Sequence, residues 1–329
     1  MNEKKILTGK ELILATKAFA SEVRWKSWAY TISTLFILVV LISGDIFLQH
    51  WWLRLPCSIL TGLVFVRFFV IYHDHQHHAI LNKSFIADVI FKSFGIFILV
   101  PASIWKRTHD YHHAHNSKLA TASIGSFPIF TKEQFLNSSK KIQRGYLIIR
   151  HPITIALGYF SVFFFGMSVQ SFFTNPAKHW DSMVAIIFHV AFTVCTIVFF
   201  GWMMWLYLIL IPFMVASALG AYLFYAQHNF PDVEFKGEIE WSYDHAALDS
   251  SSFMKMNFFW NFMTANIGYH HVHHMNSRIP FYRLPEAMKA IPELQKVKIT
   301  TLRIKDIVAC FRLKVWDPQL NKMTGVPIK

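Results

Sequence analysis

No charged residue interrupts the stretch SMVAIIFHVAFTVCTIVFFGWMMWLYLILIPFMVASALGAYLFYAQHNFP, which runs from Ser182 to Pro231 and contains 50 residues. One helical crossing of a bilayer takes about 20 mainly apolar residues, so this stretch is long enough for two crossings. Gly201 and Trp202 mark the expected turn, because glycine permits a sharp turn and tryptophan favours the membrane interface. The stretch therefore predicts a pair of membrane-spanning helices.

The rest of the chain shares this apolar character. Of its 329 residues, 54% are apolar and 16% are charged, whereas about 25% of residues are charged in soluble domains. This composition excludes a disordered chain and an ordinary soluble enzyme. Two further spans are expected at Ser27–Gly44 and Leu55–Tyr72. Ser93–Trp105 is too short to cross and suits an interfacial or re-entrant helix, while Pro152–Ala177 is long enough to cross.

Basic residues are concentrated in particular loops. Residues 1–27 hold six Lys and Arg against three acids, and residues 79–152 hold ten against three. By the positive-inside rule these regions lie in the cytoplasm. We therefore expect a cytoplasmic segment at 1–26, a membrane domain at 27–225 with a cytoplasmic insertion at 73–151, and a cytoplasmic cap at 226–329. Both termini would face the cytoplasm.

The net charge of +13 is explained by the basic loops on the cytoplasmic side of the membrane. Nucleic-acid binding is not needed to explain this charge, so no nucleic-acid partner is expected. The three cysteines are far apart and form no CxxC pair. This spacing excludes a disulfide scaffold and a thiolate metal site.

Twelve of the 18 histidines fall in three short clusters, at 73–78, 109–115 and 270–274. In each cluster some histidines are three or four residues apart, so on a helix their side chains share one face. Neutral imidazoles bind iron, zinc, copper and nickel. Eight such ligands exceed the four that zinc normally takes, and two metal ions are the natural count. His189 lies within the apolar stretch and far from the three clusters, so it is expected to be a hydrogen-bonded core residue.

Two other kinds of membrane protein also use histidines. Haem cytochromes place single axial histidines on separate spans, which does not suit adjacent pairs such as His112 and His113. A metal transporter would carry its ligands near the middle of the membrane, whereas these clusters follow the spans. A haem protein or metal carrier without substrate chemistry remains the alternative of a different class.

The clusters resemble the three histidine boxes of the membrane fatty acid desaturase family, HxxxH, HxxHH and HxxHH. Here they read HDHQH (His73–His77), HDYHH (His109–His113) and HHVHH (His270–His274). YAQHNF (Tyr225–Phe230), GYHHVHH (Gly268–His274) and SRIPFYRLPEA (Ser277–Ala287) resemble the delta-12-type acyl-lipid branch. The resemblance implies an all-α protein with four transmembrane helices, interfacial or re-entrant helices and a histidine-rich cytoplasmic cap. It also implies two iron ions bound by His73, His77, His109, His112, His113, His228, His270, His273 and His274.

The first box departs from the branch, which usually has Asp-Cys-Gly between its two histidines. Here the intervening residues are Asp74, His75 and Gln76, and His78 follows His77. His78 is therefore an alternative to His77 as the ligand. If His228 joins the earlier boxes, the chain must cross the membrane an even number of times between Tyr72 and His228. We expect Pro152–Ala177 to be the segment that does not cross.

The resemblance implies O2-dependent insertion of a cis double bond into a fatty acyl chain. The alternative on the same scaffold is hydroxylation of an alkane, carotenoid or lipid. A glycerolipid is the expected substrate, with acyl-CoA or a carrier-bound acyl group as alternatives. No haem, flavin or nicotinamide motif is present, so electrons would come from a separate protein such as ferredoxin or cytochrome b5. Residues near the boxes that could orient the imidazoles are Asp74, Asp110, Asn116, Asn229, Asp244 and Asn266.

Overall fold

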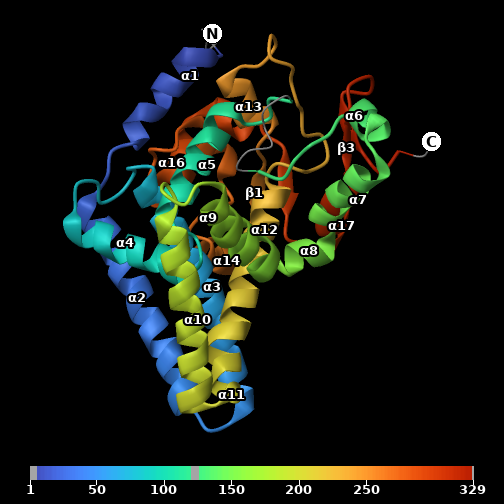
Figure 1. The fold of residues 1–329 in the computed structure, drawn as a ribbon. Coiled ribbons are helices and arrows are strands. Elements are labelled where there is room, and N and C mark those ends of the chain that lie inside the picture. The colour runs from blue at the N-terminus through green and yellow to red at the C-terminus, as the bar shows by residue number, and fades with distance from the viewer. Residues whose placement is uncertain (1–5, 120–125, 328–329) are drawn as a thin grey trace.

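Four long helices dominate the computed structural model, which describes residues 6–119 and 126–327 (Figure 1). They are α2 (Arg24–Phe47), α3 (Trp51–Gln76), α10 (Trp180–Phe200) and the continuous helical stretch Trp202–Ala226. The last consists of α11 (Trp202–Trp205), the π-helical η3 (Leu206–Leu210) and α12 (Ile211–Ala226). Each is long and apolar enough to cross a membrane. The all-α membrane architecture expected from the sequence is confirmed.

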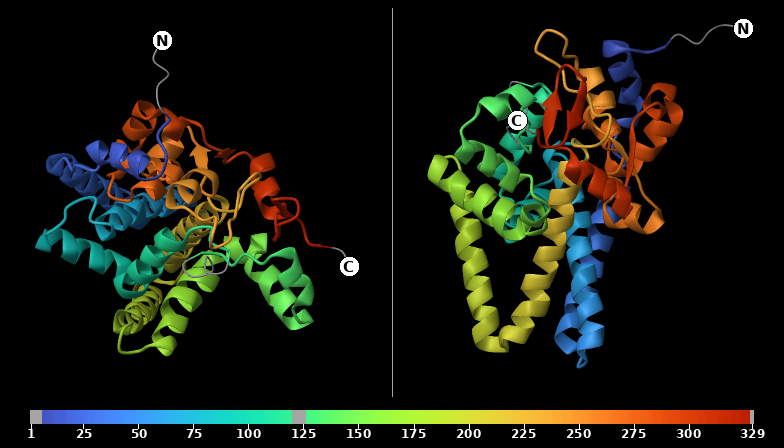
Figure 2. Two further views of the ribbon diagram at one scale, coloured as in Figure 1. Left: turned by 90° about the horizontal axis from the view of Figure 1, so that it is seen from above. Right: turned by 90° about the vertical axis from the view of Figure 1, so that its right-hand side faces the viewer.

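The four helices form two hairpins that extend in the same direction (Figure 2). The second hairpin turns at Gly201, as the sequence predicts, and its φ of +83° is a conformation that glycine adopts without strain. Helix α3 packs against both α2 and α12, and most of it is buried. Helices α2 and α10 instead expose large apolar side chains such as Phe36 and Phe199, which suits contact with lipid.

Gly62 allows α3 and α12 to pack closely. A Cβ atom at this position would lie 2.7 Å from the carbonyl oxygen of Pro212 and 2.8 Å from the Cβ of Val215. Both distances are shorter than a normal contact, so only glycine fits between the two backbones.

The short segment Ser93–Trp105 belongs to none of the four long helices, which agrees with the expectation that it is too short to cross, and a bend divides it. Helix α4 (Phe85–Phe97) ends there, and α5 (Ala102–His115) begins after a bend of 93°. Leu99 has a φ of +62° in this turn, and Pro101 immediately precedes α5. The bend points α5, with the second histidine box, away from the direction of α4.

The segment Pro152–Ala177 is also divided. It contains α8 (Pro152–Ala156), the π-helical η2 (Tyr159–Gln170) and α9 (Ser171–Thr174). None of the four long helices includes this segment, which agrees with the expectation that it does not cross the membrane. His189 on α10 accepts or donates a hydrogen bond at 2.5 Å to the hydroxyl of Tyr159 on η2. The buried His189 is thus a hydrogen-bonded core residue, as expected.

The remaining elements gather at the open end of the hairpins (Figures 1 and 2). Strands β1 (Phe253–Lys255) and β2 (Ile299–Thr301) pair in parallel, while β3 (Val315–Asp317) and β4 (Lys322–Thr324) are antiparallel. The extreme ends of the expected segments 1–26 and 226–329 lie outside the described residues. The helices here are α1 (Gly9–Thr16), η1 (Lys17–Phe19), α6 (Lys132–Asn137), α7 (Lys140–Ile149), α13 (Tyr243–Asp249), α14 (Phe258–Met263), α15 (His270–Met275), η4 (Phe281–Arg283), α16 (Leu284–Ala290), η5 (Pro292–Gln295) and α17 (Ile304–Arg312).

Candidate metal centre

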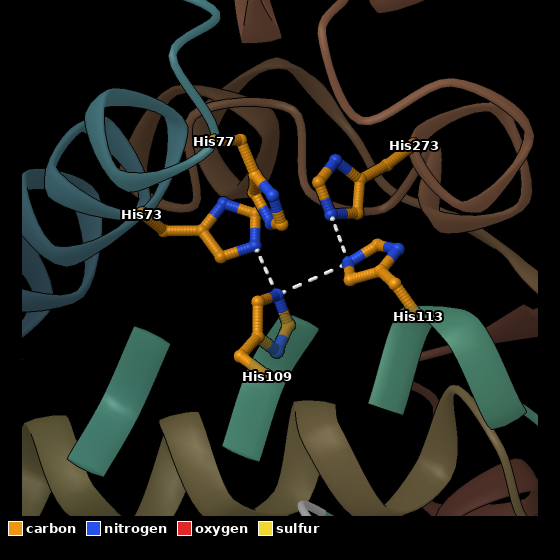
Figure 3. Close-up of side chains that lie close together, drawn as sticks. All are labelled: His73, His77, His109, His113 and His273. Atoms are coloured by element: carbon orange, nitrogen blue, oxygen red, sulfur yellow. Dashed lines mark hydrogen bonds between the residues drawn. The ribbon is translucent and has the colours of Figure 1, made fainter. Parts of the chain in front are cut away.

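The structure brings all nine expected ligands together in two buried groups. They come from four places: the end of α3, helix α5, the turn after α12, and helix α15. The first group, shown in Figure 3, contains His73, His77, His109, His113 and His273. The second group contains His112, His228, His270 and His274.

Helix α5 supplies both groups. His109 and His113 are one helical turn apart and point into the first group, whereas His112 points into the second. Helix α15 divides its histidines in the same way, with His273 in the first group and His274 in the second. The two groups therefore lie side by side between the same two helices.

The ring nitrogens converge within each group. In the first, the Nε2 atom of His109 lies 2.8 Å from that of His73 and 3.1 Å from that of His113. In the second, the Nε2 atom of His228 lies 3.0 Å from that of His112 and 2.9 Å from that of His270. Imidazole nitrogens bind zinc at about 2.0–2.1 Å. Nitrogens at a similar distance from one ion, and at right angles around it, would be about 3 Å apart, so these spacings suit metal coordination.

Burial also affects the charge of histidines in the two groups. Burial lowers the pKa of His270, His273 and His274 well below the usual range, and that of His228 to about 4. These rings are therefore neutral near pH 7, and a neutral ring can offer a lone pair to a metal. Among the described residues, neither group contains a carboxylate or a thiolate. Five imidazoles in the first group exceed the four ligands that zinc prefers, and the donor set fits iron.

Other histidines of the clusters lie outside the two groups. His78 is exposed and has a φ of +57°, although it directly follows His77. This placement favours His77 over His78 as the ligand from the first box. His75 contacts Asp88 and the carbonyl of Ile80, and His271 contacts the carbonyl of Leu294.

Asp74 is the one residue of the six proposed to orient imidazoles that contacts a site histidine in the described structure. Its Oδ1 atom lies 3.2 Å from Nδ1 of His73, and its Oδ2 accepts a hydrogen bond of 2.6 Å from the backbone N–H of Phe281. With Oδ1 accepting the Nδ1–H proton, Nε2 of His73 is free to face a metal. The carboxylate thus ties the first box to the segment after the third.

The other five have different partners. Asp110 pairs with Lys106 at the surface, and Asp244 accepts from the backbone N–H of Gly9. Asn229 binds Arg150 and the carbonyl of Cys310, while Asn266 donates to the carbonyl of Phe281. The amide of Asn116 donates to Ala246 and Ser251. The hydrogen bonds of these five side chains therefore go to partners other than the site histidines.

Two contacts to the rings come from residues that the sequence did not single out. The carbonyl oxygen of Ser250 lies 3.1 Å from Nδ1 of His228, and the ring of Trp105 stacks on His109 with their centroids 4.6 Å apart. Trp105 lies one helical turn before His109, so a contact between the two rings could have been predicted from their spacing in the sequence. Ser250 acts through its backbone 22 residues after His228, so no side-chain pattern reveals it.

Comparison with known proteins assigns this arrangement to a family. The sequence profile described as fatty acid desaturase matches residues 49–301, which include all nine histidines. The chain belongs to the fatty acid desaturase family. A Bacillus subtilis protein named fatty acid desaturase is 29% identical over 266 residues, covering 80% of this desaturase and 75% of the relative.

Two further relatives have lower sequence identity to this chain. The sn-1 oleoyl-lipid 12-desaturase of a Synechocystis species is 25% identical over 277 residues. The alignment covers 82% of this chain and 76% of the relative. The chloroplastic omega-6 fatty acid desaturase of Glycine max is 24% identical over 274 residues. The alignment covers 82% of this chain and 62% of the relative. This desaturase is accordingly an oxidoreductase of fatty acyl chains.

A cavity of about 420 Å³ leads to the histidines of this desaturase. It runs between α3, α12 and η2, and His73, His109 and His270 form part of its wall. Most of its other lining residues are apolar, and no Asp, Glu, Lys or Arg lines it among the residues that the structure describes. Its size is within the range of about 300–1,000 Å³ typical of ligand pockets. An apolar chain in this cavity would reach both histidine groups.

We expect Asp74→Asn to weaken iron binding by about 10- to 100-fold, the usual cost of losing a partner that orients a metal-bound histidine. The amide oxygen can accept from only one of the two donors, His73 Nδ1–H or the Phe281 N–H, so the change removes one hydrogen bond as well as the negative charge beside the site. Iron retention by the purified protein during titration with a chelator measures the effect. Asp110→Asn is the matched control, because Asp110 is exposed and pairs with Lys106. Equal iron retention by both variants and the wild type would show that Asp74 has no such role.

Proposed function

We propose that this chain is an O2-dependent desaturase that introduces a cis double bond into a fatty acyl chain at a di-iron centre. The observation that carries the proposal is the apolar cavity, which ends on three of the nine buried histidines. His73 and His109 belong to the first group and His270 to the second, so a bound chain would face both metals. The family match and the relatives support the same chemistry.

Two irons are assigned to the two groups. The first would be held by His73, His77, His109, His113 and His273, and the second by His112, His228, His270 and His274. When bound, iron would supply the oxidising power for breaking unactivated C–H bonds, because it can be reduced and can activate O2, which no side chain here can do. In the overall balance the acyl chain loses two hydrogens, a donor supplies two electrons and two protons, and O2 leaves as two waters.

The side chains perform the remaining tasks. Apolar walls, including Phe69, Val70 and Phe224, bind the acyl chain and exclude water from the reacting carbons. Asp74 and the Ser250 carbonyl accept ring N–H groups and so fix the orientation of His73 and His228. The rigid helices α5 and α15 set the spacing of the two groups.

A glycerolipid is the proposed form of the substrate. The cavity lies among membrane helices, and the named activity of the Synechocystis relative is on an sn-1 oleoyl-lipid. Acyl-CoA and carrier-bound acyl groups are the alternatives. We further propose a separate electron donor, ferredoxin or cytochrome b5. A bacterial inner membrane with the site facing the cytoplasm agrees with the basic loops.

Expression in a host without fatty acid desaturases tests the proposal. We expect new monounsaturated fatty acids with cis geometry, formed only with O2, and about two irons per purified chain. Membrane lipids and the acyl-CoA pool should be extracted separately, because the fraction in which the alkene first appears identifies the substrate. An alcohol in place of an alkene would support a di-iron hydroxylase instead. Haem, or zinc alone in protein kept reduced, would contradict both.

A further inference from the structure

The apolar cavity extends among the membrane helices as far as Phe65 and Phe213, the lining residues of α3 and α12 that lie farthest along these helices from the histidines. Phe65 of α3 and Phe213 of α12 line it there, with ring centroids 5.6 Å apart and edge-to-face geometry. Phe97 of α4 packs against both rings, at 5.5 Å from Phe65 and 5.3 Å from Phe213. Three mutually packed rings leave no continuation for a chain. We call Phe65 and Phe213 the floor of the cavity.

The packing just beyond the floor also blocks any continuation. Gly62 precedes Phe65 by about one helical turn, and there the backbones of α3 and α12 are in direct contact. His189 covers the other side of Phe213, with their centroids 5.0 Å apart. The floor is thus supported from below by close helix packing.

The distance from floor to metal site is fixed by α3. Phe65, Phe69 and His73 lie at successive turns of this helix and all line the cavity. Eight residues of α-helix span about 12 Å. Because α3 is continuous and largely buried, this distance is rigid. A chain whose end touches the floor would place a defined carbon beside His73.

The polarity of the cavity decides which end of the substrate reaches the floor. Among the described residues, no Asp, Glu, Lys or Arg lines the cavity, so a carboxylate or phosphate head would lose its hydration there without a charged partner. Two lining residues, Gln170 and Ile149, are exposed, and we call the surface beside them the rim of the cavity. The head group therefore stays at the rim, and the methyl end enters first.

We propose that Phe65 and Phe213 receive the methyl end of the acyl chain, and that their distance from the histidines sets the position of the double bond counted from that end. This inference rests on the proposed desaturase function. It identifies the residues that select the position, which the activity alone leaves open. Chains that differ in length should then be desaturated at the same distance from the methyl end.

The test uses the full-length protein in a desaturase-free host supplied with hexadecanoic, heptadecanoic or octadecanoic acid. Mass spectrometry of dimethyl disulfide adducts locates the double bond in each product. We expect a constant distance from the methyl end for all three acids. A constant distance from the carboxyl end would overturn the inference while leaving the desaturase function intact. Absence of any unsaturated product from the wild type would instead refute the proposed function.

Variants of the floor provide the second arm. Phe65→Ala should let the chain sink deeper, so that the double bond moves toward the carboxyl end by one or more carbons. Ala216→Leu adds volume just above Phe213 on the cavity wall and should move it the opposite way. Phe68→Ala is the matched control: Phe68 is equally buried on α3 but packs on Phe91 and Phe94 and does not line the cavity.

Iron content and thermal stability of each variant show whether it is folded. If Phe65→Ala fails to fold, the milder Phe65→Leu and the opposite shift in Ala216→Leu still test the floor. An unchanged double-bond position in folded Phe65→Ala and Ala216→Leu would overturn the inference. A shift in Phe68→Ala of the same size would do so as well, because it would show that any loss of core volume has this effect.

Discussion

Replacing His273 by alanine is expected to remove desaturase activity and at least one iron per chain. His273 belongs to the first group, where its Nε2 atom lies 3.0 Å from that of His113. Alanine leaves four imidazoles around a site built for five and opens space for water. Activity should fall more than about 100-fold, since even the loss of an outer partner costs about 10- to 100-fold. Iron analysis together with product profiling measures both effects, and His112→Ala is expected to act likewise on the second group.

His78→Asn is the matched control for this experiment. His78 directly follows the first histidine box, but it is exposed and belongs to neither group. Asparagine tolerates its positive φ, so the backbone should remain unchanged. Normal iron content in His78→Asn and loss in His77→Ala would identify the ligand of the first box. Full activity in His273→Ala or His112→Ala would refute the ligand assignment.

Gly62→Ala should have the largest effect on stability of any single-methyl change considered. The new Cβ would lie 2.7 Å from a backbone oxygen of α12, and backbone cannot rotate away as a side chain can. Overpacking in a tight core costs about 1–3 kcal/mol, and a clash with backbone belongs at the upper end. We expect a clear drop in the thermal unfolding temperature of the iron-loaded protein in detergent, and less protein in the membrane.

The matched control is Gly145→Ala on α7. A Cβ at Gly145 meets no atom within 4 Å, so the same methyl group is added without a clash. Alanine is favoured over glycine inside a helix by about 0.5–1 kcal/mol, so this variant should be neutral or slightly stabilised. An unfolding temperature for Gly62→Ala equal to that of Gly145→Ala would show that α3 and α12 separate easily.

The membrane helices could be predicted from the sequence because charge and length determine which segments can cross a bilayer. The uncharged stretch around Gly201 and the short segment before Trp105 both behave as their composition predicts. Composition does not show which span is central, however. Helices α3 and α10 are both strongly apolar, yet α3 is mostly buried in protein whereas α10 is mostly exposed. That difference arises from packing partners such as the Gly62 contact, which have no local sequence signal.

The histidine groups were predictable for a related reason. Residues three or four positions apart on a helix share one face, so the histidines of one box that lie together could be predicted from that box alone. The division between groups depends on how α5 faces α15, and this pairing of distant segments is visible only in the structure. Hydrogen bonds to the rings were mostly unpredictable. Asp74 is adjacent to His73 and was found, whereas the Ser250 carbonyl belongs to a distant loop.

The histidines of the two groups come from four separate segments of the chain. His73 and His228 end two membrane helices, whereas α15 belongs to the part that packs over them. Each bound ion would therefore link the part of the chain that contains α15 to the membrane helices. Binding of a metal to the folded form alone stabilises that form. Iron supply in the cell would then govern the lifetime of the polypeptide as well as its turnover, and newly inserted chains that acquire no metal would be the ones open to proteolysis.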